Sequence, residues 1–145
     1  MTDNLTVSRG VFLGSSGTDT AVGVAINSDN IIMVAGNDNG SGKLYRLSPQ
    51  SGSSPLSQTD LGGTVSDLAL VQGTTVGQQD RIVVVGSFGI KVYDPTGATV
   101  IWQQPGNFQE VAVTTNGTVI TLAADKTLSL WSNTGTLLDS SNAIG

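Results

Sequence analysis

Short apolar runs separated by turn residues follow one another along the whole chain. The runs are rich in valine, isoleucine, leucine and threonine, and glycine, asparagine, aspartate or proline stands at their ends. Runs of this kind predict β-strands, and no stretch keeps the 3.6-residue period of an amphipathic helix. We therefore expect an all-β protein with almost no helix.

The runs recur in a fixed order. The motif GVAI at residues 23–26 returns as DLAL at 67–70 and as EVAV at 110–113, at offsets of 44 and 43 positions. Each motif is followed by a second apolar run, a third run that ends in a turn, and a shorter, more polar fourth run. Four strands in a period in the low forties are typical of a β-propeller blade. The sequence predicts three four-stranded antiparallel repeats, as a partial propeller or half of an oligomeric ring.

Two further patterns concern the inner strands and one loop. The inner two runs of each repeat are apolar nearly throughout, which is typical of a sheet covered on both faces. The second repeat carries a longer polar insertion at residues 72–80, which we expect to form an exposed loop.

The repeat also sets the expected boundaries within one propeller unit of residues 1–145. The parts are the outer strand of a preceding blade, expected at 6–13, with its junction (1–19), blade one (20–62), blade two (63–106), blade three (107–141) and the start of a next repeat (142–145). Closed propellers usually have about four to eight blades, so three blades leave the ring incomplete. Either the remaining blades belong to a longer chain, or two copies form a homodimer that closes a six-bladed ring.

Composition removes several classes of function. The chain has no cysteine and no histidine, which excludes disulfides, thiolate catalysis, Ser-His-Asp hydrolysis and ordinary zinc catalysis. Lysine and arginine number 6 against 11 acidic residues, a net charge of −5, so we expect no nucleic-acid partner. No apolar run approaches the ~20 residues of a membrane-spanning helix, and we find no signal-peptide pattern in this sequence.

Two acidic residues hold equivalent places in adjacent repeats. Asp67 and Glu110 stand at the start of the first strand, which in a propeller lies at the mouth of the central channel. Carboxylates on adjacent blades, on the order of 10 Å apart, would be candidates for glycoside hydrolysis. The alternative, which we favour, is that they bond backbone N–H groups and fix the blade entrance. The first repeat has Gly23 at this position, so the set of acids is incomplete.

The segment 37–42 (NDNGSG) resembles part of a calcium loop, with oxygen-bearing side chains at its first, third and fifth positions. The twelfth position is Ser48, which lacks the bidentate carboxylate that such loops use. We therefore expect no cofactor and no metal site, with at most weak calcium binding. The segment is interpreted as a flexible hairpin loop.

Candidate ligand contacts come from aromatic rings and from polar loops. Tyr93 ends a third strand, where a bulky ring is expected to pack against the next blade. Trp102 lies in a more exposed outer strand and is the better contact candidate. The candidates from loops are Asp38, Asn39, Gln78 and Gln79.

The repeats resemble those of bacterial β-propeller proteins. Residues 14–37 resemble the SBBP-type repeat through Gly17, Asp19, Ala21, Gly23, Val24, Ala25, Ile26 and Gly36. The later units resemble the quinoprotein or WD40-like superfamily through their turns VYDPTG and LWSNTG. The resemblance implies a propeller fold in a bacterial protein, and its motifs specify strand packing rather than an activity.

Together these patterns favour a non-catalytic propeller module for protein or glycan binding, adhesion or scaffolding. Two alternatives stay open: a glycoside hydrolase that uses Asp67 and Glu110, and a carbohydrate-binding lectin that uses Trp102 or Tyr93. Low charge and abundant serine, threonine and asparagine fit an extracellular or cell-surface protein of a bacterium.

Overall fold

The computed structural model describes residue 13 and residues 15–49, 55–73 and 79–142. These residues form twelve strands and no helix, as the sequence predicts. The expected outer strand at 6–13 and the expected start of a next repeat at 142–145 lie almost wholly outside the described residues.

The strands form three four-stranded antiparallel sheets, each a simple meander, which confirms the predicted fold class. The first sheet contains β1 (Asp19–Ile26), β2 (Ile32–Asp38), β3 (Ser41–Leu47) and β4 (Ser57–Asp60). The second contains β5 (Val65–Val71), β6 (Arg81–Gly86), β7 (Gly89–Tyr93) and β8 (Val100–Gln104). The third contains β9 (Phe108–Val113), β10 (Val119–Ala123), β11 (Thr127–Trp131) and β12 (Leu137–Asn142).

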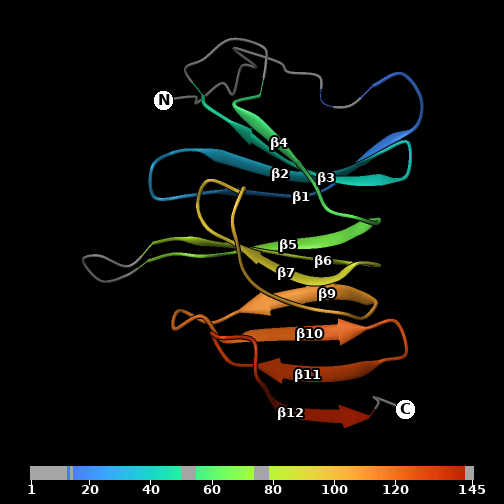
Figure 1. Cartoon of the computed structure of the whole chain (residues 1–145), viewed down its shortest axis with the longest axis vertical. Helices are drawn as coiled ribbons and strands as arrows, with labels where there is room; N and C mark the ends of the chain where they lie inside the picture. Colours follow the sequence, from blue (N-terminus) through green and yellow to red (C-terminus); the bar gives the residue numbers. More distant parts are fainter. Residues whose placement is uncertain (1–12, 14, 50–54, 74–78, 143–145) are drawn as a thin grey trace, which may run out of the picture.

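The sheets are stacked, with the second sheet between the other two (Figure 1). The chain leaves each sheet by its fourth strand and enters the next sheet by its first strand. As a result β1 contacts β5, and β5 contacts β9. First strands that meet along the stack, with fourth strands at the far edges, are the arrangement of successive propeller blades.

Every first strand carries a β-bulge at the same place in the repeat. The extra residue is Val22 in β1, Ser66 in β5 and Gln109 in β9, at spacings of 44 and 43 positions. A bulge bends its strand and increases the local twist. The three first strands are therefore equivalent in structure as well as in sequence.

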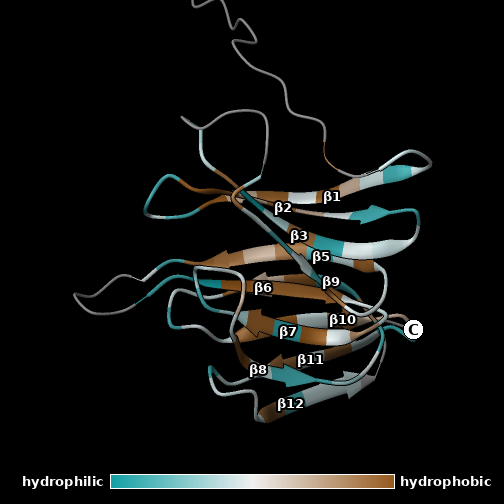
Figure 2. Cartoon of the chain, turned by 45° about the horizontal axis from the view of Figure 1, so that its top comes forward, coloured by the Kyte–Doolittle hydropathy of each residue, from teal (hydrophilic) through white to brown (hydrophobic). Residues whose placement is uncertain are grey.

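Two apolar clusters hold the stack together. The first interface, between the first and second sheets, is built around Met33, Ala35, Leu44, Ile82, Val84 and Tyr93. The second interface, between the second and third sheets, is built around Val83, Val85, Ile90, Val92, Trp102, Phe108, Val119 and Trp131. Figure 2 shows the apolar character of the strands at these two levels of the stack.

Strand β6 supplies both interfaces at once. Ile82 and Val84 face the first sheet, while Val83 and Val85 face the third, as the two-residue period of a strand requires. All four side chains are 0% exposed. The nearly continuous apolar run read from the sequence is thus explained by cover on both faces.

The hairpin expected at 37–42 is present, but its turn is much shorter than the expected six-residue loop. Strand β2 runs through Asp38 and β3 begins at Ser41, so Asn39 and Gly40 alone form a tight hairpin turn. Their φ angles of 50° and 85° are those of a type I′ turn, which Asn-Gly adopts at low cost. The same dipeptide at 116–117 lies in the turn between β9 and β10.

A buried hydrogen bond fixes Trp131 within the second interface. The indole Nε1 donates to the Thr121 hydroxyl at 2.9 Å, and the ring meets Phe108 edge-on with 6.2 Å between centroids. Thr121 is 0% exposed, so water has no access to its hydroxyl.

Thr121→Val should lower the free energy of unfolding by about 1–3 kcal/mol, because a methyl group replaces the acceptor and leaves a buried indole N–H unpaired. Thr121→Ser keeps the hydroxyl and should lose only about 0.8 kcal/mol for its missing methyl group. Urea unfolding measures both variants. A valine variant at least as stable as the serine variant would contradict the role given to this bond.

Candidate functional site

A polar cleft of about 300 Å³ lies between the second and third sheets, where β5 ends and β6 begins. The polar side chains that line it are those of Gln72, Gln79, Arg81, Thr115, Asn116 and Asn133. Val71 and Ile101 add an apolar part to the wall. Among the described residues that line the cleft, Arg81 alone carries a charge. Amides and a guanidinium offer many donors and several acceptors to a ligand rich in hydroxyl or carbonyl groups.

Two turns of the third sheet and the first residue of β6 form this wall. Arg81, the first residue of β6, donates from Nη1 to the main-chain carbonyl of Asn133 and so links the two sheets. Beside Asn133, in the β9–β10 turn, the Asn116 side-chain oxygen accepts hydrogen bonds from the hydroxyl groups of Thr114 and Thr118. The cleft is therefore bordered by a cross-sheet bond and by an internally bonded turn.

Asp80 anchors the insertion that carries Gln72 and Gln79. Its carboxylate accepts hydrogen bonds from Ser28 N–H at 2.7 Å, from the Ser28 hydroxyl at 2.9 Å and from Gly73 N–H at 2.8 Å. Ser28 belongs to the β1–β2 turn, so Asp80 also ties the insertion to the first sheet. The sequence predicts an exposed loop at 72–80. Gln72 and Gln79 are indeed exposed, but Asp80 is buried.

The environment of Asp80 lowers its pKa below the ordinary value. Desolvation on burial acts to raise the pKa, but the hydrogen bonds from Ser28 and Gly73 outweigh it. The carboxylate is therefore held in its charged form, which is the form that accepts all three bonds.

Asp67 and Glu110 are not brought together. Asp67 accepts a hydrogen bond from Leu68 N–H at 2.8 Å and, across the second interface, from Val111 N–H at 3.0 Å. Val111 packs toward the second sheet, so its neighbour Glu110 is on the opposite face of the third sheet, where it is exposed. Asp67 takes the structural role weighed above, and a strand separates the two carboxyl groups.

The two aromatic candidates lie inside the stack. Tyr93 is 2% exposed in the first interface, and Trp102 is 9% exposed in the second. Gly135 of the third sheet lies directly against the Trp102 ring, where even an added Cβ would come within 2.7 Å of it. Packing accounts for both rings, and neither presents an open face for stacking on a sugar.

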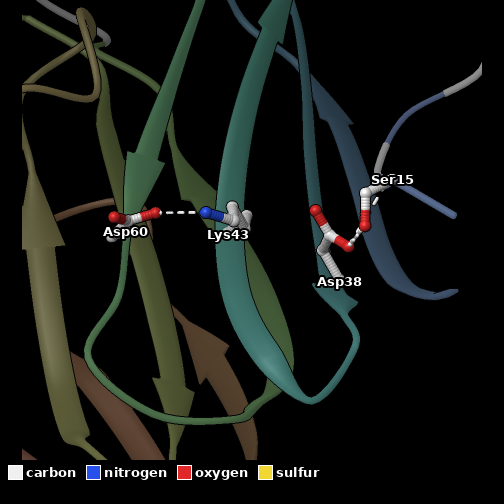
Figure 3. A network of polar contacts seen from close by, with 4 residues as sticks. All are labelled: Ser15, Asp38, Lys43 and Asp60. Carbon is white, nitrogen blue, oxygen red and sulfur yellow. Dashed lines mark hydrogen bonds and ion pairs between the residues drawn. The ribbon is translucent and has the colours of Figure 1, made fainter. Parts of the chain in front are cut away.

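Asp38 and Asn39 hold the segment that precedes β1. Asp38 accepts hydrogen bonds from the hydroxyl and the N–H of Ser15 (Figure 3). The Asn39 side chain donates to the Ser16 carbonyl and accepts from Thr18 N–H. The hydroxyl bond from Ser15 is the main cause that lowers the pKa of Asp38. Nearby, the ion pair between Lys43 and Asp60 spans 2.6 Å, and its hydrogen bond raises the pKa of Lys43.

In the calcium-like segment at 37–42, the Asn37 side-chain oxygen also takes part in a hydrogen bond within the protein. The Asn37 amide donates to the Val65 carbonyl at 2.9 Å and accepts from Val65 N–H at 2.8 Å. In the part of the chain that the structure describes, no group of three or more aspartate and glutamate side chains is placed to hold a metal ion. Across those same residues no helix is long and apolar enough to cross a membrane.

Of the cleft residues, only Gln79 is expected from the sequence, and Gln78 lies outside the described residues. The repeat pattern nevertheless indicates where the other cleft residues lie. In an antiparallel meander alternate turns fall at the same end of the sheet, so the insertion at 72–80 and the turns at 114–118 and 132–136 share one end. Arg81, Asn116 and Asn133 stand at or beside these turns.

No family model matches the chain, and no curated protein matches it. Solved structures do match, among them "KlHsv2 with loop 6CD replaced by a Gly-Ser linker", a propeller-like yeast protein. The two are 10% identical with a TM-score of 0.50, over 86% of this chain and 40% of that chain. At this identity the likeness concerns the fold alone. The chain has a propeller-like all-β fold and spans about two fifths of the length of that structure.

Acidification should remove the stability that Asp80 contributes. Its pKa is lowered on folding, so the contribution is complete above the ordinary value of 3.8 and is lost as the pH falls through the lower folded-state pKa. At pH 7, Asp80→Asn should cost about 1–3 kcal/mol of unfolding free energy. Urea unfolding at pH 7 and pH 3 should show a smaller difference between the two proteins at pH 3. An equal difference at both pH values would contradict this assignment.

Asp67→Ala should also destabilise the stack, by about 1–3 kcal/mol, because Val111 N–H loses its acceptor inside the second interface. Asp29→Ala removes an exposed carboxylate from the β1–β2 turn and should change stability by less than about 0.5 kcal/mol. Equal thermal unfolding of the two variants would show that the bond between Asp67 and Val111 contributes nothing.

Proposed function

We propose that the protein is a non-catalytic propeller module that binds a polar ligand, a glycan or a protein surface, in the cleft between the second and third sheets. The observation that carries this proposal is the cleft lining: exposed amides and Arg81, held by turns that are themselves hydrogen-bonded. Loops on a rigid sheet scaffold are the usual place for binding residues.

The chemistry of the lining favours hydroxyl-rich or carbonyl-rich ligands. An amide side chain donates through its nitrogen and accepts through its oxygen, which matches the two roles of a sugar hydroxyl or a peptide group. Arg81 adds a fixed positive charge, which favours ligands with a carboxylate or sulfate. A protein loop fits the same donors, so glycans and peptides are both screened.

The hydrolase alternative draws no support from the placement of its two acids. Asp67 is occupied by two backbone N–H groups, and Glu110 is on the far face of the third sheet. Neither residue lines the cleft. Two carboxyl groups separated by a sheet are not placed on either side of one glycosidic bond, as a glycoside hydrolase requires.

The lectin alternative is retained in a modified form. Stacking on Tyr93 or Trp102 needs an open ring, and both rings are packed between sheets. A sugar in this cleft would instead be held by the amides and by the apolar contact of Ile101. Recognition without a stacking aromatic ring suggests weak single sites, which several copies would strengthen.

The finer family and setting belong to the same proposal. We propose an SBBP-like bacterial repeat protein at the cell surface, with adhesion or scaffolding as its use. Support comes from the residue pattern of the first repeat and from the low charge. The ring is completed either by a second copy or by further blades of a longer chain.

A double variant, Gln72→Ala with Gln79→Ala, tests the cleft. Both side chains are exposed, so their loss should leave stability within about 0.5 kcal/mol of wild type. Binding of the best ligand from an array of neutral and acidic oligosaccharides and a peptide library should weaken at least tenfold, for about 1.4 kcal/mol lost. Gln103→Ala, an exposed glutamine outside the cleft, is the matched control. Equal binding by both variants would contradict the site.

A further inference from the structure

The two internal interfaces show which positions of a repeat meet the neighbouring sheets. The face of the second sheet that meets the third is formed by Val83, Val85, Ile90 and Val92, all 0–1% exposed. The face that meets the preceding sheet is formed in the second sheet by Leu68, Leu70, Ile82 and Val84. We call these positions the outgoing face and the incoming face of a sheet.

The outgoing face of the third sheet repeats the apolar pattern, but among the described residues no sheet packs against it. Its residues at the matching positions are Ile120, Leu122, Leu128 and Leu130. Ile120 pairs with Leu130 and Leu122 with Leu128, so the four side chains share one face. Leu128 is 42% exposed and the others are only partly buried, whereas their counterparts in the second sheet are fully buried.

The incoming face of the first sheet is the matching apolar surface for such an interface. The matching positions hold Val24, Ile26, Ile32 and Val34, and Val24 pairs with Val34 as Ile26 pairs with Ile32. Val24 is 69% exposed and Ile26 57% exposed, although both are β-branched residues within a strand. Large exposed apolar faces of this kind mark association surfaces in soluble proteins.

Glu110 fits the same junction. It occupies the repeat position of Asp67, whose carboxylate crosses the second interface to Val111 N–H at 3.0 Å. The residue of the first sheet that corresponds to Val111 is Val24. Docking of a first sheet on the outgoing face of a third sheet would therefore place Val24 N–H within reach of Glu110.

We propose that two copies of the chain dock head to tail, the outgoing face of each third sheet against the incoming face of the other first sheet, and close a ring of six sheets. Each junction would repeat an interface that the chain already makes twice within itself, and the two-fold ring leaves neither face without a partner. Six sheets lie within the usual range of closed propellers. Asp139 stands where Trp102 stands in β8, so the edge of the junction is polar, as interface rims are.

This inference rests on the propeller assembly proposed above, and light scattering of the purified chain tests it. The expected mass is twice 14.8 kDa at micromolar concentration. Val24→Glu and Leu128→Glu each place a charge in both junctions and should give monomers that still unfold cooperatively, because both side chains are exposed in the single chain. Leu137→Glu is the matched control: Leu137 is 50% exposed and pairs with Trp131, on the opposite face of the third sheet.

Mixing the two monomeric variants distinguishes head-to-tail docking from other contacts. A mixed pair retains one unaltered junction, so species of two chains should reappear. Glu110→Ala should weaken the dimer at least fivefold, while Glu110→Gln keeps an acceptor oxygen and should weaken it less. A wild-type monomer would overturn the inference, as would open chains longer than two copies or a dimer that survives both face variants. Ligand binding in the cleft is measured separately on the Leu128→Glu monomer. The proposed function is therefore tested independently of whether the chain forms a dimer.

Discussion

Each sheet of this protein has two apolar faces, and the structure depends on covering them by stacking sheet on sheet. The second sheet meets this constraint on both sides, and Ile82, Val83, Val84 and Val85 of β6 are fully buried as a result. Apolar burial of this kind contributes about 25 cal/mol for each Å² removed from water, so the stacked faces are the main source of stability. Within the part of the chain that the structure describes, the outer two sheets are covered by another sheet on one side only.

Polar side chains connect the sheets around these apolar interfaces. Thr59 donates to the Gly97 carbonyl at 2.7 Å across the first interface, and Gln104 donates to the Gly135 carbonyl at 2.8 Å across the second. Asp80 and Asp67 add further cross-sheet bonds from carboxylates. Such bonds fix the relative position of the sheets, because a shifted sheet would leave buried polar groups unpaired. Several of the polar residues that suggest chemistry in the sequence thus serve the fold.

The sequence predicts the fold better than it predicts the site. The repeat period and the apolar runs identify strands and sheets, since both follow from backbone periodicity and burial. The Asn39-Gly40 dipeptide also indicates a tight turn. The polar residues around it, at 37–42, resemble a calcium loop, and the sequence pattern therefore favours a longer loop. The cleft could not be read in the same way, because Arg81, Asn116 and Asn133 come together only when the second and third sheets stack. Trp102 shows the reverse: an outer strand suggests exposure, and the glycine turn of the neighbouring sheet covers the ring.

Hydrogen exchange measured strand by strand tests the central claim, that cover on both faces of a sheet controls its stability, most directly. In dilute solution the amides of β6 should exchange far more slowly than those of β2 and β10, whose sheets have one open face each. At concentrations where two copies associate, β2 and β10 should approach the protection of β6. Equal exchange of all three strands in dilute solution, or β2 and β10 that stay fast in the associated state, would contradict the account.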